Sequence, residues 1–184
     1  NVLAEENAQK AHWLKILEQN HLYDLIEQQV APQIAVLNDL LKELKCTDNQ
    51  AYAHHLLGKT VAIGTYIKRR SNLIFITRQK KTVAWGELEL CLNESAANLR
   101  LCHIPCKINL NGGGHISAAC AYAVYDLFEE FIEQSFDALD SLLLYLEIQE
   151  AGVLFNLCTA CTQAPIALKK FYPAPDIRQD DDGL

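Results

Sequence analysis

Two long stretches of helical periodicity, joined by a short link of turn-forming residues, constrain this fold more than any other feature of the sequence. In residues 4–44 and again in residues 51–80, apolar side chains recur in steps of three and four. Such spacing gathers them on one face of a helix. The link "KCTDNQ" offers Thr47 or Asp48 as the N-cap of the second helix. The sequence therefore predicts two long helices in an antiparallel hairpin.

The stripe on the first helix has the spacing of a heptad seam and predicts a coiled coil. Its members are Trp13, Ile16, Asn20, Tyr23, Glu27, Val30, Ile34, Leu37, Leu41 and Leu44. Polar interruptions such as Asn20 fix the register and oligomeric state of a coiled coil. Pro32 removes a backbone donor and predicts a local kink. Because a lone hairpin cannot bury so broad an apolar face, we expect two chains to form a dimeric four-helix bundle.

Shorter elements follow from Trp85 onward and predict a second domain. We expect helices over residues 86–102, 116–136 and 165–172, and strands over residues 106–111, 141–148 and 153–160. This order is typical of helices packed on one face of a small mixed sheet. The expected fold is α+β, with a helical hairpin domain at residues 1–82 and an α/β sandwich domain at residues 83–184. The chain stops at "DDDGL", a predicted turn and strand start, so we expect a fragment truncated at its C-terminus.

Composition and charge exclude several classes of protein. Hydrophobic residues make up 50% of the chain, which supports a packed core and argues against disorder. The net charge of −7 argues against a nucleic-acid partner. No apolar run reaches the ~18 residues that a membrane span needs, so we expect a cytoplasmic protein. The 7 cysteines are irregularly spaced and odd in number, which indicates reduced intracellular thiols.

The segment "HLYDLIEQQVAP" resembles the phosphoacceptor region of bacterial sensor histidine kinases. One subfamily has a His-Asp-x-x-x-Gln motif, of which Asp24 and Gln28 are present here, while Tyr23 takes the place of the histidine. Residues 58–75 and 90–110 look like a bacterial branch of kinase-like proteins with a degenerate core. The resemblance extends over about residues 20–184 and implies a dimerisation hairpin followed by a GHKL-like ATPase-type domain.

The same resemblance implies where a nucleotide site would lie. In GHKL domains, a long helix carries a Glu and, four residues later, an Asn that holds magnesium; here the two positions are Glu129 and Glu133. A glutamate can bind Mg²⁺ through oxygen, but it adds negative charge beside the phosphates. The glycine-rich nucleotide segments of the family are not found, because Asp182-Gly183 lacks the second glycine and Gly112–Gly114 precede the helix. We therefore expect degenerate or absent kinase chemistry and no bound cofactor.

The main interpretation is a cytoplasmic signalling module of a two-component, histidine kinase-like protein. Its partners would be a second copy of the chain, a response regulator or another signalling protein, and a membrane sensor segment upstream of this chain. The alternative is an active kinase with Mg-ATP at Glu129 and Glu133, and His21 as the acceptor. Basic residues Lys68, Arg69 and Arg70 can dock an acidic partner, although a solvated helix face is the simpler interpretation.

A third interpretation is a structural domain stabilised by zinc. Cys102 and Cys106 form one pair of candidate ligands, and Cys158 and Cys161 form another. Tetrahedral zinc takes four sulfur or nitrogen ligands, often from two such pairs. Cysteine is also a common small core residue, so the four thiols have a purely structural explanation as well.

Overall fold

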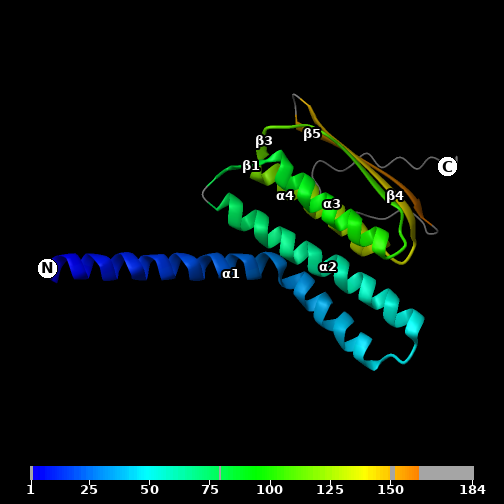
Figure 1. The fold of residues 1–184 in the computed structure, drawn as a ribbon, viewed down its shortest axis with the longest axis horizontal. Coiled ribbons are helices and arrows are strands. Elements are labelled where there is room, and N and C mark those ends of the chain that lie inside the picture. Colours follow the sequence, from blue (N-terminus) through cyan, green and yellow to red (C-terminus); the bar gives the residue numbers. More distant parts are fainter. Residues whose placement is uncertain (1, 79, 150–151, 162–184) are drawn as a thin grey trace.

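The computed structural model describes residues 2–78, 80–149 and 152–161. The predicted helix over 165–172 and the Asp182-Gly183 turn lie outside these residues. The elements are α1 (Val2–Cys46), α2 (Gln50–Thr77), β1 (Thr82–Ala84), α3 (Trp85–Leu101), β2 (Cys106–Asn111), β3 (His115–Ser117), α4 (Ala118–Ser135), β4 (Leu139–Gln149) and β5 (Gly152–Cys161). Figure 1 shows three successive layers: the α1–α2 pair, then α3 and α4, then the strands. The α+β class is therefore confirmed.

Helices α1 and α2 run in opposite directions and contact each other along the C-terminal part of α1 (Figure 1). Asn49 caps α2, because its side-chain oxygen accepts from the backbone N of Tyr52 at 3.1 Å. The predicted caps, Thr47 and Asp48, are wrong by one or two residues; Thr47 Oγ1 accepts from Asn49 N instead. A side chain in this tight link satisfies a backbone donor that the helix start leaves unpaired.

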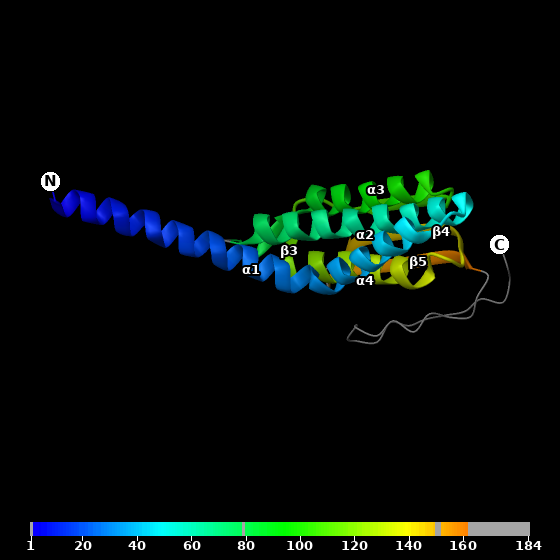
Figure 2. The same cartoon turned by 90° about the horizontal axis from the view of Figure 1, so that it is seen from below.

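The heptad face of α1 is rotated by about one residue from the predicted stripe over part of its length. Leu22 and Val30 are buried, whereas Tyr23 is 68% exposed. In both views the N-terminal part of α1 projects beyond the rest of the molecule (Figures 1 and 2). Figure 1 also shows α1 changing direction near the middle of its length, and Pro32 lies inside this helix. This bend agrees with the missing backbone donor.

The sheet is mixed, and α3 and α4 lie on one face of it, between the sheet and α2 (Figure 1). Strands β2 and β4 are parallel, β4 and β5 are antiparallel, and the order is β2-β4-β5. Leu88 and Leu92 of α3, Phe128 of α4, and Leu144 and Leu146 of β4 are fully buried. These side chains form the core between the helical layer and the sheet.

A second, two-stranded sheet was not expected from the sequence. Strand β1 pairs antiparallel with β3, with Val83 opposite Ile116. Ser117 ends β3 and caps α4, since its Oγ accepts from Cys120 N at 3.1 Å. The predicted start of this helix at residue 116 is therefore two residues early.

Helix α2 shares a continuous apolar cluster with the second half of the chain. Its residues Ala62, Tyr66 and Leu73 belong to the same buried cluster as the inner faces of α3 and α4. The predicted domain boundary after residue 82 falls inside β1. Among the described residues, no helix is both long and apolar enough to cross a membrane.

Candidate functional site

A groove of about 540 Å³ is lined by α1, α2 and α4, and it brings three predicted site residues together. We call it the interhelical groove. Helix α1 contributes Gln29, Pro32, Gln33, Val36 and Leu40. Helix α2 contributes Lys59, Ala62, Ile63, Tyr66 and Arg70. Helix α4 and the residue after its C-terminus contribute Asp126, Glu129, Glu130, Ile132, Glu133, Gln134 and Phe136. Helix α1 contacts α2 far more than it contacts α4. A space therefore remains between α1 and α4.

One end of the interhelical groove is formed by a buried arginine. The Arg70 side chain is 6% exposed; its Nε lies 2.8 Å from Asp126 Oδ1. Its Nη2 donates to Asp126 Oδ2 at 3.1 Å and to Gln29 Oε1 at 3.3 Å, and its guanidinium lies 3.9 Å from the centre of the Tyr122 ring. Burial, together with the Asp126 charge, raises the pKa of Tyr66, which donates to Asp126 at 2.9 Å. A buried charge of this kind requires its partner.

At the other end, Lys59 lines the groove and belongs to a second set of charged side chains. Lys59 Nζ donates to Asp137 Oδ2 at 2.6 Å, and His55 Nε2 lies 2.6 Å from Asp137 Oδ1. Lys59 also lies 6.0 Å from the centre of the Phe136 ring. Partial burial acts to raise the pKa of Asp137, but the hydrogen bonds from Lys59 and His55 outweigh it and lower this pKa. These contacts attach α2 to the turn that follows α4.

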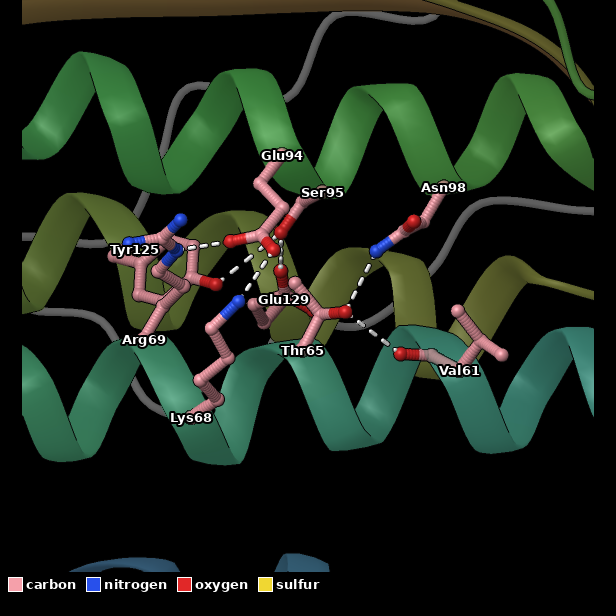
Figure 3. Close-up of polar contacts among 9 residues, drawn as sticks. All are labelled: Val61, Thr65, Lys68, Arg69, Glu94, Ser95, Asn98, Tyr125 and Glu129. Carbon is pink, nitrogen blue, oxygen red and sulfur yellow. Dashed lines mark hydrogen bonds and ion pairs between the residues drawn. The ribbon is translucent and has the colours of Figure 1, made fainter.

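Glu129, in the middle of the interhelical groove, is a buried carboxyl group (Figure 3). It is 8% exposed, and its Oε1 accepts from Ser95 Oγ at 2.5 Å. Burial raises the pKa of Glu129 to about 8, against the hydrogen bonds from Ser95 and Tyr125 and with the help of the Glu133 and Asp126 charges. The group is therefore mostly protonated at neutral pH, which makes it a poor ligand for Mg²⁺.

The three residues of the predicted basic docking cluster all form ion pairs inside the chain. Lys68 Nζ donates to Glu94 at 2.6 Å, and Arg69 pairs with the same carboxylate (Figure 3). The hydrogen bond from Lys68 is the main cause that lowers the pKa of Glu94. With Arg70 on Asp126, these pairs join α2 to both α3 and α4. These pairings could not be predicted from the sequence, because Glu94 and Asp126 lie far along the chain from the basic run.

The predicted phosphoacceptor candidates lie outside the interhelical groove. His21 and Tyr23 are both exposed on α1, and neither lines the groove. Glu129 and Glu133 do line it, as does Arg70. His55, Lys59, Asp126 and Asp137 were missed as site residues. His55 and Lys59 are four residues apart on one helix face, which is the signal that could have singled them out.

The four candidate zinc ligands are not brought together. Cys106 is buried on the side of β2 that faces the helices, and burial raises its pKa to about 11. Cys158 pairs with Leu143, an exposed residue on the opposite face of the sheet. Cys102 lies against Gly58 of α2 and Cys161 is half-buried beside the core. Within residues 2–78, 80–149 and 152–161, no three His, Cys, Asp or Glu side chains are grouped to hold a metal ion.

Ion pairs thus join α2 to α3 and α4. The interhelical groove contains one buried carboxyl group, Glu129. The chain was compared with protein-family models, with curated proteins and with solved structures, and no match was found in any of the three comparisons.

Proposed function

We propose that this chain is a cytoplasmic signalling module related to sensor histidine kinases, which dimerises through α1 and α2 and has little or no kinase activity. The position of Glu129 carries this proposal. It occupies the place that the resemblance gives to a side chain at the magnesium site, yet it is buried and hydrogen-bonded to Ser95. A mostly protonated carboxyl group beside the Glu133 carboxylate neither binds Mg²⁺ well nor attracts phosphates.

The order of elements supports the kinase-like part of the proposal. A long helical pair precedes a mixed sheet with helices on one side, which is the layout that the resemblance implies. Tyr23, at the place of the acceptor histidine, is exposed on α1 but carries no imidazole. The module would therefore pass a signal through contacts with a response regulator or another signalling protein instead of through a phosphohistidine.

Exposed apolar side chains on α2 support dimerisation. Leu57 is 47% exposed, Val61 is 38% exposed and Phe75 is 63% exposed. Their spacing places them on one stripe of the helix. On α1, Leu14 and Leu17 are exposed as well, at 66% and 61%. A second copy of the hairpin would bury these side chains and form the four-helix bundle that the heptad pattern favours.

Calorimetry tests whether the chain binds Mg-ATP. Mg-ATP is titrated into the purified chain, and into a Glu133→Asn variant that restores the amide of the family pattern. We expect no heat of binding up to about 1 mM from either protein, because Glu129 remains buried in both. Micromolar binding, or phosphate incorporation from ATP that His21→Ala abolishes, would overturn the inactive module in favour of an active kinase.

Light scattering tests the dimer. Leu57→Glu places a charge in the proposed interface, whereas Leu90→Glu changes an α3 residue that is equally exposed, at 47%. We expect the unchanged chain and Leu90→Glu to have the mass of two chains and Leu57→Glu the mass of one. A monomeric unchanged chain, or equal effects of the two substitutions, would contradict dimerisation through α2.

A further inference from the structure

The interhelical groove has the size and mixed lining of a site for a small molecule. Its volume of about 540 Å³ lies within the range of known ligand pockets, which is roughly 300–1,000 Å³. Apolar side chains come from all three helices, with Val36 on α1, Ile63 on α2 and Ile132 on α4. Such walls favour a ligand with an apolar body.

The charges at the two ends of the groove are already neutralised. Arg70 is paired with Asp126 at one end, and Lys59 is paired with Asp137 at the other. The charge of each cation is therefore balanced by an aspartate, although Arg70 Nη1 is buried without a hydrogen-bond partner and could still donate to a polar atom of a ligand. An anion would also meet the negative charge of the α4 carboxylates that line the groove.

Glu133 lies between Asp126 and Asp137 in the sequence, but unlike them it has no cationic partner among the described residues. Its carboxylate forms no hydrogen bond or ion pair within the described part of the chain, although it lines the groove. It also lies four residues from Glu129 on the same helix face, and the two groups repel each other when both are charged. A cation could therefore pair with Glu133 without displacing an ion pair that the chain already makes.

We propose that the interhelical groove binds a small organic amine, whose ammonium group pairs with Glu133 and whose apolar body packs between α1 and α4. The ammonium donates to the Glu133 carboxylate. The body lies on Val36 and Pro32 of α1, Ile63 of α2 and Ile132 of α4. The ligand thus contacts three helices at once.

An organic amine fits this groove better than a metal ion does. Mg²⁺ and Ca²⁺ take six or more oxygen ligands, many of them waters, and gain nothing from apolar walls. An amine with a hydrocarbon body uses both the carboxylate and the apolar side chains. Its charge also suits a chain with a net charge of −7.

Binding of 4-phenylbutylamine, measured by calorimetry against the full chain, tests this inference. Its neutral analogue, 4-phenylbutan-1-ol, has the same body without the charge. We expect the amine to bind at least about tenfold more tightly than the alcohol, because a charge-assisted hydrogen bond contributes roughly that factor or more. Equal binding of the two compounds, or no binding of the amine up to about 10 mM, would overturn the proposal.

Three variants locate the site. Glu133→Gln removes the proposed partner and should weaken amine binding about tenfold, whereas Glu87→Gln on α3 should leave it unchanged. Val36→Trp fills the groove from α1 and should abolish binding without touching a charge. Circular dichroism confirms that each variant is folded. Equal losses in Glu133→Gln and Glu87→Gln would mean attraction to overall negative charge and would overturn the site.

This inference does not depend on the relationship to histidine kinases. Amine binding is measured without ATP and without regard to the mass of the protein in solution. A monomeric or kinase-active chain would contradict the proposed function but leave the amine site standing. Loss of the distinction between amine and alcohol would remove the site and leave the proposed function intact.

Discussion

Helices α3 and α4 contact α2 on one side and the sheet on the other, and the two contacts differ in chemistry. Toward the sheet, fully buried Leu88, Leu92, Phe128, Leu144 and Leu146 form an apolar core. Toward α2, apolar side chains alternate with the ion pairs of Glu94, Asp126 and Asp137. Separating two packed apolar surfaces exposes them to water and costs free energy. Separating an exposed ion pair costs less, because water solvates both charges. The contact with the sheet is therefore apolar throughout, whereas the contact with α2 combines the same continuous apolar cluster with ion pairs.

The largest effect is expected from the apolar side. Leu144→Ala should lower the free energy of unfolding by about 2–5 kcal/mol, because it removes fully buried methyl groups and leaves a cavity. Its neighbour Leu143 is 38% exposed on the other face of β4, so Leu143→Ala should cost less than about 1 kcal/mol. Chemical denaturation measures both. Similar losses from the two substitutions would mean that the sheet is not packed against the helices as described.

The free energy of unfolding is expected to depend on pH through Glu129, the buried carboxyl group on α4. Its pKa of about 8 in the folded chain lies above the ordinary value of 4.5, so the folded state holds a proton that the unfolded state has released. Stability from this group is complete below pH 4.5 and is lost as pH rises to about 8. Glu129→Gln should remove this loss, worth roughly 2 kcal/mol or more between pH 5 and pH 8. The free energy of unfolding of both proteins is measured with denaturant across this pH range. Parallel profiles would contradict the role given to Glu129.

Smaller effects are expected from the ion pairs of α2, and they should differ from one another. Asp126→Asn leaves the Arg70 side chain, 6% exposed, without its counter-ion and should cost about 2 kcal/mol. Glu94→Gln weakens pairs with Lys68 and Arg69, of which Lys68 is 56% exposed, and should cost less than about 1 kcal/mol. Thermal unfolding in low and high salt separates the two. A larger loss from Glu94→Gln would reverse the expected ranking.

The long elements could be predicted from the sequence because their periodicity extends over several turns or alternations. This holds for α1, α2, β2 and the β4–β5 pair. Strands β1 and β3 could not, because three residues are too few to show an alternating pattern. The cap of α2 was missed since Thr47, Asp48 and Asn49 are all good capping residues, and only the backbone geometry selects among them.

The candidate site was predictable in part. Glu129 and Glu133 were singled out by resemblance, but the burial of Glu129 against Ser95 depends on how α3 packs on α4. For Lys68 and Arg70 the sequence predicted a solvated helix face or an outside acidic partner, because a basic run does not reveal distant carboxylates such as Asp126. The four cysteines suggested one metal site because spacing alone does not show which face of a sheet each side chain occupies.

The length of α1 means that a small change in its direction gives a larger displacement at its N-terminal end. The helix runs without interruption from Val2 to Cys46, and its N-terminal part extends beyond the other layers (Figure 2). At 1.5 Å per residue, the segment from residue 2 to Glu18, which pairs with Arg78, is about 24 Å long. Rotating this segment by about 5° at Glu18 shifts its tip by about 2 Å. A small change in the direction of α1 is therefore enlarged along the segment that projects from the molecule.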